Sequence, residues 1–149
     1  MTNLMKSIAV TVAVLLTTST TANANGWYAP SANPTSIGTI SVGIADAAKD
    51  ACWTNLREVR EYAEEKLRIR GYNVVAEIGG GYEFAISVDA FRNDAGSCIG
   101  TFDVQIWAGN TRNGVFGFHE IGSVQNYGTN RNNLNNWVIG VISEMIEEM

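Results

Sequence analysis

The sequence is poor in cysteine, histidine and proline, with two cysteines, one histidine and two prolines among 149 residues. Two cysteines and one histidine make a thin ligand set for zinc, so we expect no metal site. The chain also lacks a G-x-S-x-G nucleophile elbow. The glycines at residues 79–81 lack the lysine and the following helix that a phosphate-binding loop needs. These absences argue against several common enzyme classes, and nothing in the sequence requires a cofactor.

Basic residues are outnumbered by acidic ones. The chain has 10 lysines and arginines against 15 aspartates and glutamates, which gives a net charge of −5. An acidic chain of this size repels phosphate backbones, so we predict that nucleic acid is not a partner. Charges of both signs concentrate in residues 57–70, and this mixture is typical of the solvated side of a helix.

The first 24 residues have the pattern of a secretory signal peptide. Lys6 precedes an apolar run at residues 8–16, and Ala22-Asn23-Ala24 matches an A-x-A cleavage site. The run is about half the roughly 20 residues that a membrane-spanning helix needs. We therefore expect residues 1–24 to be removed and the mature chain to be periplasmic or secreted, without spanning the membrane.

Cys52 and Cys98 would then reach an oxidising compartment, which favours a disulfide between them. The bond would close a loop of roughly 45 residues, a constraint worth about 4 kcal/mol in the chain-entropy model. A catalytic thiol is the alternative, but no histidine has a convincing position beside either cysteine.

Residues 25–41 contain both prolines and predict an extended lead-in that ends in an edge strand at about residues 37–42. The remaining residues, 42–149, suffice for one domain with a single core. The expected organisation is a signal peptide at 1–24, the lead-in at 25–41 and one α+β domain at 42–149.

Apolar residues at helical spacing predict two amphipathic helices. In residues 45–70 the successive spacings are 3, 4, 4, 3, 4 and 4, with Asp46 placed as a cap and Gly71 after the last turn. A second helix is expected at residues 132–148. The first apolar stripe consists of Ala45, Ala48, Cys52, Leu56, Val59, Ala63 and Leu67.

Four strands are expected between the helices, at residues 72–78, 82–90, 100–108 and 115–124. The middle two alternate apolar and polar residues, which is typical of half-buried antiparallel strands. The segment at residues 109–114 is expected to be a loop. The register of the last strand stays open, because its sequence VFGFHEIGSV does not alternate cleanly.

The register of the middle pair follows from burial. Pairing Ile86 with Val104 and Val88 with Phe102 puts every large aliphatic side chain on one face, and a slip of one residue would bury Asp103. The resulting fold class is a two-layer α+β sandwich in the order helix, four-stranded antiparallel meander, helix. One disulfide, Cys52–Cys98, would join the first helix to the sheet.

The exposed face of this sheet carries the candidate catalytic residues. Asp89 and Asp103 become diagonal neighbours about 7 Å apart, and His119 joins them if it lies opposite Gln105. A carboxylate pair with an imidazole could act as general acid and base. An open sheet face, however, shows polar residues to water in any case and lacks the concavity of an active site. The non-catalytic interpretation is therefore preferred.

Trp107, Phe91 and Ile99 share that face in the chosen register. Aromatic residues interleaved with acids suit a protein-binding surface, unless the lead-in or a dimer partner covers them.

The leading hypothesis is a non-catalytic binding or accessory domain, such as an inhibitor, that recognises an envelope or extracellular protein or polymer. Its candidate binding residues are Trp107, Phe91, Asp89, Asp103 and Gln105. One alternative is a small extracytoplasmic hydrolase centred on Asp89, Asp103 and His119. The other is a structural envelope protein that assembles as a homo-oligomer.

Overall fold

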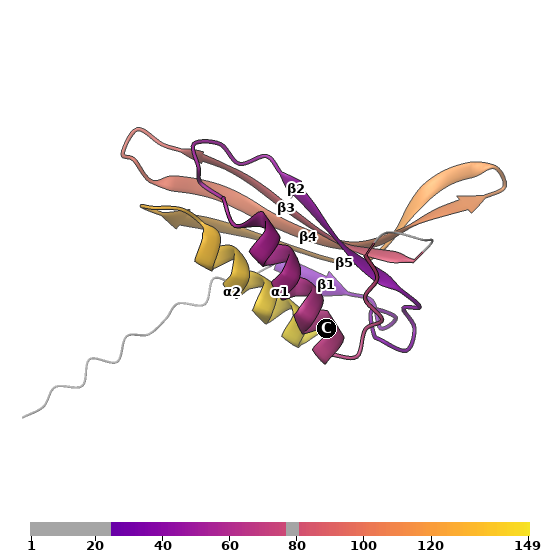
Figure 1. Cartoon of the computed structure of the whole chain (residues 1–149). Coiled ribbons are helices and arrows are strands. Elements are labelled where there is room, and N and C mark those ends of the chain that lie inside the picture. Colours follow the sequence, from indigo (N-terminus) through magenta and orange to yellow (C-terminus); the bar gives the residue numbers. More distant parts are fainter. Residues whose placement is uncertain (1–24, 77–80) are drawn as a thin grey trace, which may run out of the picture.

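The computed structural model describes residues 25–76 and 81–149, so the expected signal peptide at 1–24 lies outside the described residues. The chain forms a five-stranded mixed sheet in the order β1-β5-β4-β3-β2, with two helices that lie side by side on one face (Figure 1). The elements are β1 Asn25–Tyr28, β2 Ile40–Asp46, α1 Leu56–Ile69, β3 Tyr82–Arg92, β4 Cys98–Arg112, β5 Val115–Asn130 and α2 Asn135–Glu148. Neither described helix is long and apolar enough to cross a membrane.

The predicted four-stranded antiparallel meander was wrong, because the sheet has five strands and is mixed. The edge strand expected at about residues 37–42 is present as β2, shifted to Ile40–Asp46. β2 pairs in parallel with β3, and α1 makes the crossover between them. β1 comes from the lead-in and pairs antiparallel with β5. The expected strand at residues 72–78 is absent from its described part, 72–76, where Val74 makes one isolated bridge to Ile40. Residues 77 and 78 lie outside the described residues.

The first helix is shorter than predicted. Residues 45 and 46 belong to β2, and α1 begins only at Leu56. The Asp46 carboxylate accepts a hydrogen bond from the Ala48 backbone N–H at 2.9 Å, so it starts a loop and does not cap the helix. Asp50 and Ala51 both have positive φ, which no α-helix tolerates. Gly71, with φ of 93°, follows the end of α1 as predicted.

The hydrophobic core lies between the sheet and the two helices. The predicted pairs Ile86–Val104 and Val88–Phe102 are confirmed, and all four side chains are fully buried. The helices cover them with buried apolar residues, namely Val59, Ala63 and Leu67 of α1 and Val138, Val141, Ile142, Met145 and Ile146 of α2. The core therefore uses one face of the sheet.

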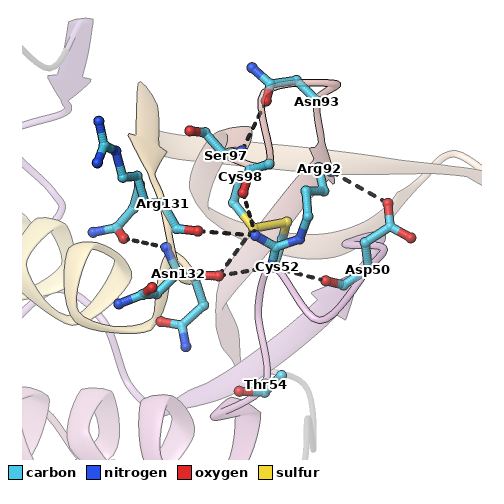
Figure 2. The surroundings of a disulfide bond; sticks show 12 residues. Asp50, Cys52, Thr54, Arg92, Asn93, Ser97, Cys98, Arg131 and Asn132 are labelled. Carbon is cyan, nitrogen blue, oxygen red and sulfur yellow. Dashed lines mark hydrogen bonds between the residues drawn. A yellow bond between two sulfur atoms is a disulfide. The ribbon is translucent and has the colours of Figure 1, made fainter.

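The predicted disulfide between Cys52 and Cys98 is confirmed, with a Cα–Cα distance of 5.4 Å. Cys52 lies in the loop before α1 and Cys98 is the first residue of β4, so the bond joins a loop, and no helix, to the sheet. Figure 2 shows Arg92 beside this bond. Its guanidinium donates to four backbone carbonyls, those of Gly96 at 2.7 Å, Asn132 at 2.8 Å, Arg131 at 3.1 Å and Asp50 at 3.3 Å.

β4 and β5 continue beyond the other strands as a two-stranded ribbon, residues 108–119, seen in orange in Figure 1. Within it, residues 108–112 pair with 115–119. Asn113 and Gly114 form the turn with φ of 54° and 76°, as in a two-residue hairpin of type I′. The loop predicted at residues 109–114 was therefore wrong, because only these two residues form the turn. A β-bulge between Ile106 and Trp107 marks where the ribbon leaves the sheet.

Candidate functional site

The candidate site is the face of the sheet opposite the helices, called the outer face here. No described helix covers it, and strand alternation sends every second side chain of β3 and β4 toward it. In the register set by the predicted Ile86–Val104 and Val88–Phe102 pairs, Ser87 lies opposite Asp103 and Asp89 opposite Thr101. The residues on this face of β3 and β4 are Glu83, Ala85, Ser87, Asp89, Phe91, Ile99, Thr101, Asp103, Gln105 and Trp107.

Three aromatic rings, those of Trp107, Phe118 and Phe116, form a continuous row from the outer face onto the ribbon. The rings of Trp107 and Phe118 meet edge to face with centroids 4.8 Å apart, and those of Phe118 and Phe116 do so at 5.2 Å. Phe116 is 63% exposed and Phe118 is 67% exposed. This aromatic row therefore presents large apolar surface to solvent while its rings hold one another in place.

A second apolar group lies at the other end of the outer face. Phe91 pairs with Ile99, and Tyr127 pairs with Thr101 two positions along β4, so the three side chains are neighbours. All three are exposed. The outer face is thus apolar at both ends and polar between them, with Asp89, Asp103 and Gln105 in the polar part.

Between β2, β3 and β4 the outer face is hollowed, and the volume of this acidic hollow is about 280 Å³. Trp107 lines one part of it, and the side chains of Glu83 and Asp103 line others. The glycine at position 43 leaves room for the Glu83 carboxylate, because a Cβ there would overlap it. Because residue 43 has no side chain, the Glu83 carboxylate can lie across β2.

Both carboxyl groups of the hollow are perturbed. Burial, reinforced by the negative charge of Glu120, raises the pKa of Asp103. Burial also raises the pKa of Glu83, although the positive charge of Arg60 lowers it in part. The Asp103 Oδ1 atom is buried and accepts no hydrogen bond from any described residue. The hollow therefore holds carboxylates that are poorly solvated and poorly paired.

The structure does not assemble the residues of the hydrolase hypothesis. Gln105 pairs with Ser123, and His119 pairs with Ala108. Because Ala108 follows Trp107 along β4, His119 projects from the face opposite the two aspartates, where its ring centroid lies 6.5 Å from that of Tyr82. Among the described residues, no group of three histidine, cysteine or acidic side chains is placed to hold a metal ion.

Sequence reasoning missed Gly43 and Tyr127 as parts of the outer face. Gly43 lies between the edge strand expected at residues 37–42 and the helical stripe expected from residue 45, although ISVGIAD alternates as a strand does. Tyr127 was beyond the predicted end of the last strand. The dipeptide Asn113-Gly114 was the signal that could have fixed the hairpin and hence the register of β5.

Comparison with known proteins shows the fold alone. No protein-family model matches the sequence, and no curated protein matches it significantly. A PelC dodecamer from Paraburkholderia phytofirmans superimposes with a TM-score of 0.55 at 13% identity, covering 85% of this chain and 95% of that chain. A dodecamer of a PelC variant from the same organism has a TM-score of 0.56 at 16% identity, with coverages of 85% and 95%. Lipoprotein GNA1162 from Neisseria meningitidis is less similar, with a TM-score of 0.37 at 14% identity and coverages of 74% and 96%.

Proposed function

We propose that the chain is an extracytoplasmic, non-catalytic binding protein whose interaction surface is the outer face together with the aromatic row. The compartment is supported by the signal-peptide pattern of residues 1–24 and by the Cys52–Cys98 disulfide, which persists in oxidising surroundings. The non-catalytic role is supported by the separation of His119 from the carboxylates on opposite faces of the sheet.

The aromatic row is the observation that carries this proposal. Exposed aromatic side chains that lie together mark interaction surfaces, because burying them against a partner removes apolar area from water. The row sits on a ribbon whose described surroundings bury neither Phe116 nor Phe118. A partner that closes over the row gains this burial without any rearrangement of the core.

The test is affinity capture by the oxidised, exported protein from the envelope fraction of the cells that make it. The informative variant carries Phe116→Ser with Phe118→Ser. Ile69→Ser is the matched control, since Ile69 is 71% exposed on α1, away from the outer face. Loss of the captured material from the double variant alone supports the proposal, and equal capture by all three proteins contradicts it.

Self-association is a second candidate function, favoured by one observation. Both PelC structures of similar fold are dodecamers. In this chain the aromatic row and the Phe91–Ile99–Tyr127 group are at opposite ends of one face, so the row of one copy contacting the group of the next would be a head-to-tail interface. Such heterologous interfaces close into rings or continue as filaments.

Sedimentation velocity over a range of concentrations tests self-association. The sedimentation coefficient of the wild-type protein should rise with concentration, and Phe116→Ser with Phe118→Ser should abolish the rise while Ile69→Ser retains it. A wild-type protein that stays monomeric at every concentration rules this candidate out and leaves binding to another molecule.

A further inference from the structure

We infer that the acidic hollow is a binding site for an organic cation, specifically an ammonium or guanidinium group. This inference rests on the proposed binding function and names the chemical class that this part of the outer face recognises. Three of the lining residues would contact the cation, namely Glu83, Asp103 and Trp107. Gly43 also lines the hollow and leaves room for the Glu83 carboxylate.

The size of the hollow limits what enters it. Pockets for drug-sized ligands have volumes of roughly 300–1,000 Å³, whereas this hollow measures about 280 Å³. It therefore suits the end of a side chain or a small amine. The position of the Glu83 carboxylate depends on Gly43, because any larger residue would displace it.

The charge of the hollow selects a cation. Among the described residues the ion pairs are Arg57–Glu61, Lys66–Glu147 and Arg68–Glu64, so neither Glu83 nor Asp103 has a partner of opposite charge in contact. Burial raises the pKa of both carboxyl groups, which means that their ionised forms are under-solvated. A cation bound in the hollow would supply stabilisation that these carboxylates lack and, by linkage, lower their pKa values.

One unsatisfied polar atom belongs to the lining of the hollow, and a second lies nearby on β2. Asp103 Oδ1 is buried without a hydrogen-bond partner among the described residues. Ser41, which lies opposite Glu83 and two positions before Gly43 on β2, is 3% exposed, and its hydroxyl likewise has no partner in the described structure. Buried polar atoms are normally hydrogen-bonded, so the unpartnered Oδ1 of Asp103, a residue that lines the hollow, suits a donor brought by a ligand.

Trp107 favours an organic cation over a metal ion. An indole ring attracts ammonium and guanidinium groups through the quadrupole of its π-system, whereas calcium and magnesium require a shell of several oxygen ligands. Within the described chain no metal-binding group of three side chains exists. Two carboxylates and one indole ring therefore suit a guanidinium group or an alkylammonium group, each of which carries both positive charge and N–H donors.

The test is an NMR titration of the exported, oxidised protein with ethylguanidinium, followed at the indole N–H of Trp107. The signal is assigned by its absence in Trp107→Phe. We expect a saturable shift of this signal and weakening of the affinity by about tenfold in Asp103→Asn, equivalent to about 1.4 kcal/mol. Asp94→Asn removes the same charge from the exposed β3–β4 turn and should change the affinity less than about twofold.

Two further arms complete the experiment. Gly43→Ala should weaken binding as Asp103→Asn does, because the added Cβ displaces the Glu83 carboxylate while leaving the net charge unchanged. A blocked Gly-Arg-Gly peptide that binds as tightly as ethylguanidinium assigns the hollow to a protein side chain, and weaker binding of the peptide assigns it to a free small cation.

The inference is overturned if ethylguanidinium leaves the Trp107 signal unshifted, or if Asp94→Asn weakens binding as much as Asp103→Asn. Either result would show that only general attraction to an acidic protein operates. Failure of the cation site can be told apart from failure of the proposed binding function. The test of the binding function changes Phe116 and Phe118, which do not line the hollow.

Discussion

Trp107 and Phe118 pack edge to face across β4 and β5, with ring centroids 4.8 Å apart, immediately beyond the bulge where the ribbon leaves the sheet. The contact links the ribbon to the outer face and leaves Phe118 67% exposed. Because such exposed contacts contribute little to folding stability, the aromatic row suits a binding role better than a stabilising one.

The first prediction concerns the stability of the ribbon variant. Phe116→Ser with Phe118→Ser should lower the free energy of unfolding by less than about 1 kcal/mol, because both side chains are mostly exposed in the folded state. Urea unfolding measures this. A much larger loss would mean that the aromatic row is part of the core and would undermine its assignment as a binding surface.

Gly128 and Trp137 give the second prediction. A Cβ on Gly128 would approach the Trp137 ring to 2.6 Å, and this ring also packs edge to face on Phe102. Gly128→Ala should therefore destabilise the protein by about 1–3 kcal/mol through overpacking. Gly140→Ala is the control, because a Cβ there meets nothing within 4 Å, and in the interior of α2 alanine should stabilise by up to about 1 kcal/mol. Equal effects in urea unfolding would show that Trp137 is free to move.

The third prediction concerns the pH dependence of stability. The pKa of Asp103 is raised by burial in the folded protein above its ordinary value of about 3.9. The stability it contributes is therefore complete below pH of about 3.9 and is lost as the pH rises through the folded-state pKa.

Asp103→Asn removes this loss, so the variant should be more stable than the wild type at pH 7. Its advantage should shrink as the pH falls toward 4. Urea midpoints at both pH values measure the difference, with Asp94→Asn as the charge-matched control. A variant that is less stable than the wild type at pH 7 would indicate that the Asp103 carboxylate is stabilised by contacts in the fold.

Arg92 gives the fourth prediction. Its guanidinium donates to carbonyls from three loops around the disulfide, a geometry that the point charge of lysine does not reproduce. Arg92→Lys should cost about 1–3 kcal/mol of folding free energy. Arg57→Lys is the control, and it should leave the folding free energy unchanged because the Arg57 side chain is 90% exposed. Thermal unfolding of the oxidised proteins separates the two, and matching midpoints would show that the four carbonyls are equally well satisfied by water.

The register of β3 and β4 was predictable because both strands alternate without interruption and one face is fully apolar. The slip that would bury Asp103 beside Ile86 costs too much to compete. The disulfide was predictable from the number of cysteines and the signal-peptide pattern. The register followed from which residues must be buried, and the disulfide followed from the oxidising compartment. The sequence shows the first in its alternation and the second in its signal-peptide pattern.

The bounds and the pairing of the edge strands were not predictable in the same way, although an edge strand was expected at about residues 37–42. Ala45, Ala48 and Cys52 continue the helical spacing of α1 by coincidence, since small apolar residues fit a strand end and a loop equally well. The bulge at Trp107 changes the phase of β5, so its alternation breaks where the ribbon begins. The condition under which His119 would join the aspartates, a position opposite Gln105, is therefore not met.

The most direct measurement is capture from the envelope fraction by the wild-type protein, the Phe116→Ser/Phe118→Ser variant and the Ile69→Ser control, all oxidised and in equal amounts. We expect the wild type and the control to retain the same molecule, a second copy of the chain or a different partner, and the double variant to lose it. Retention of that molecule by all three proteins would contradict binding through the aromatic row, as would retention of nothing by the wild type.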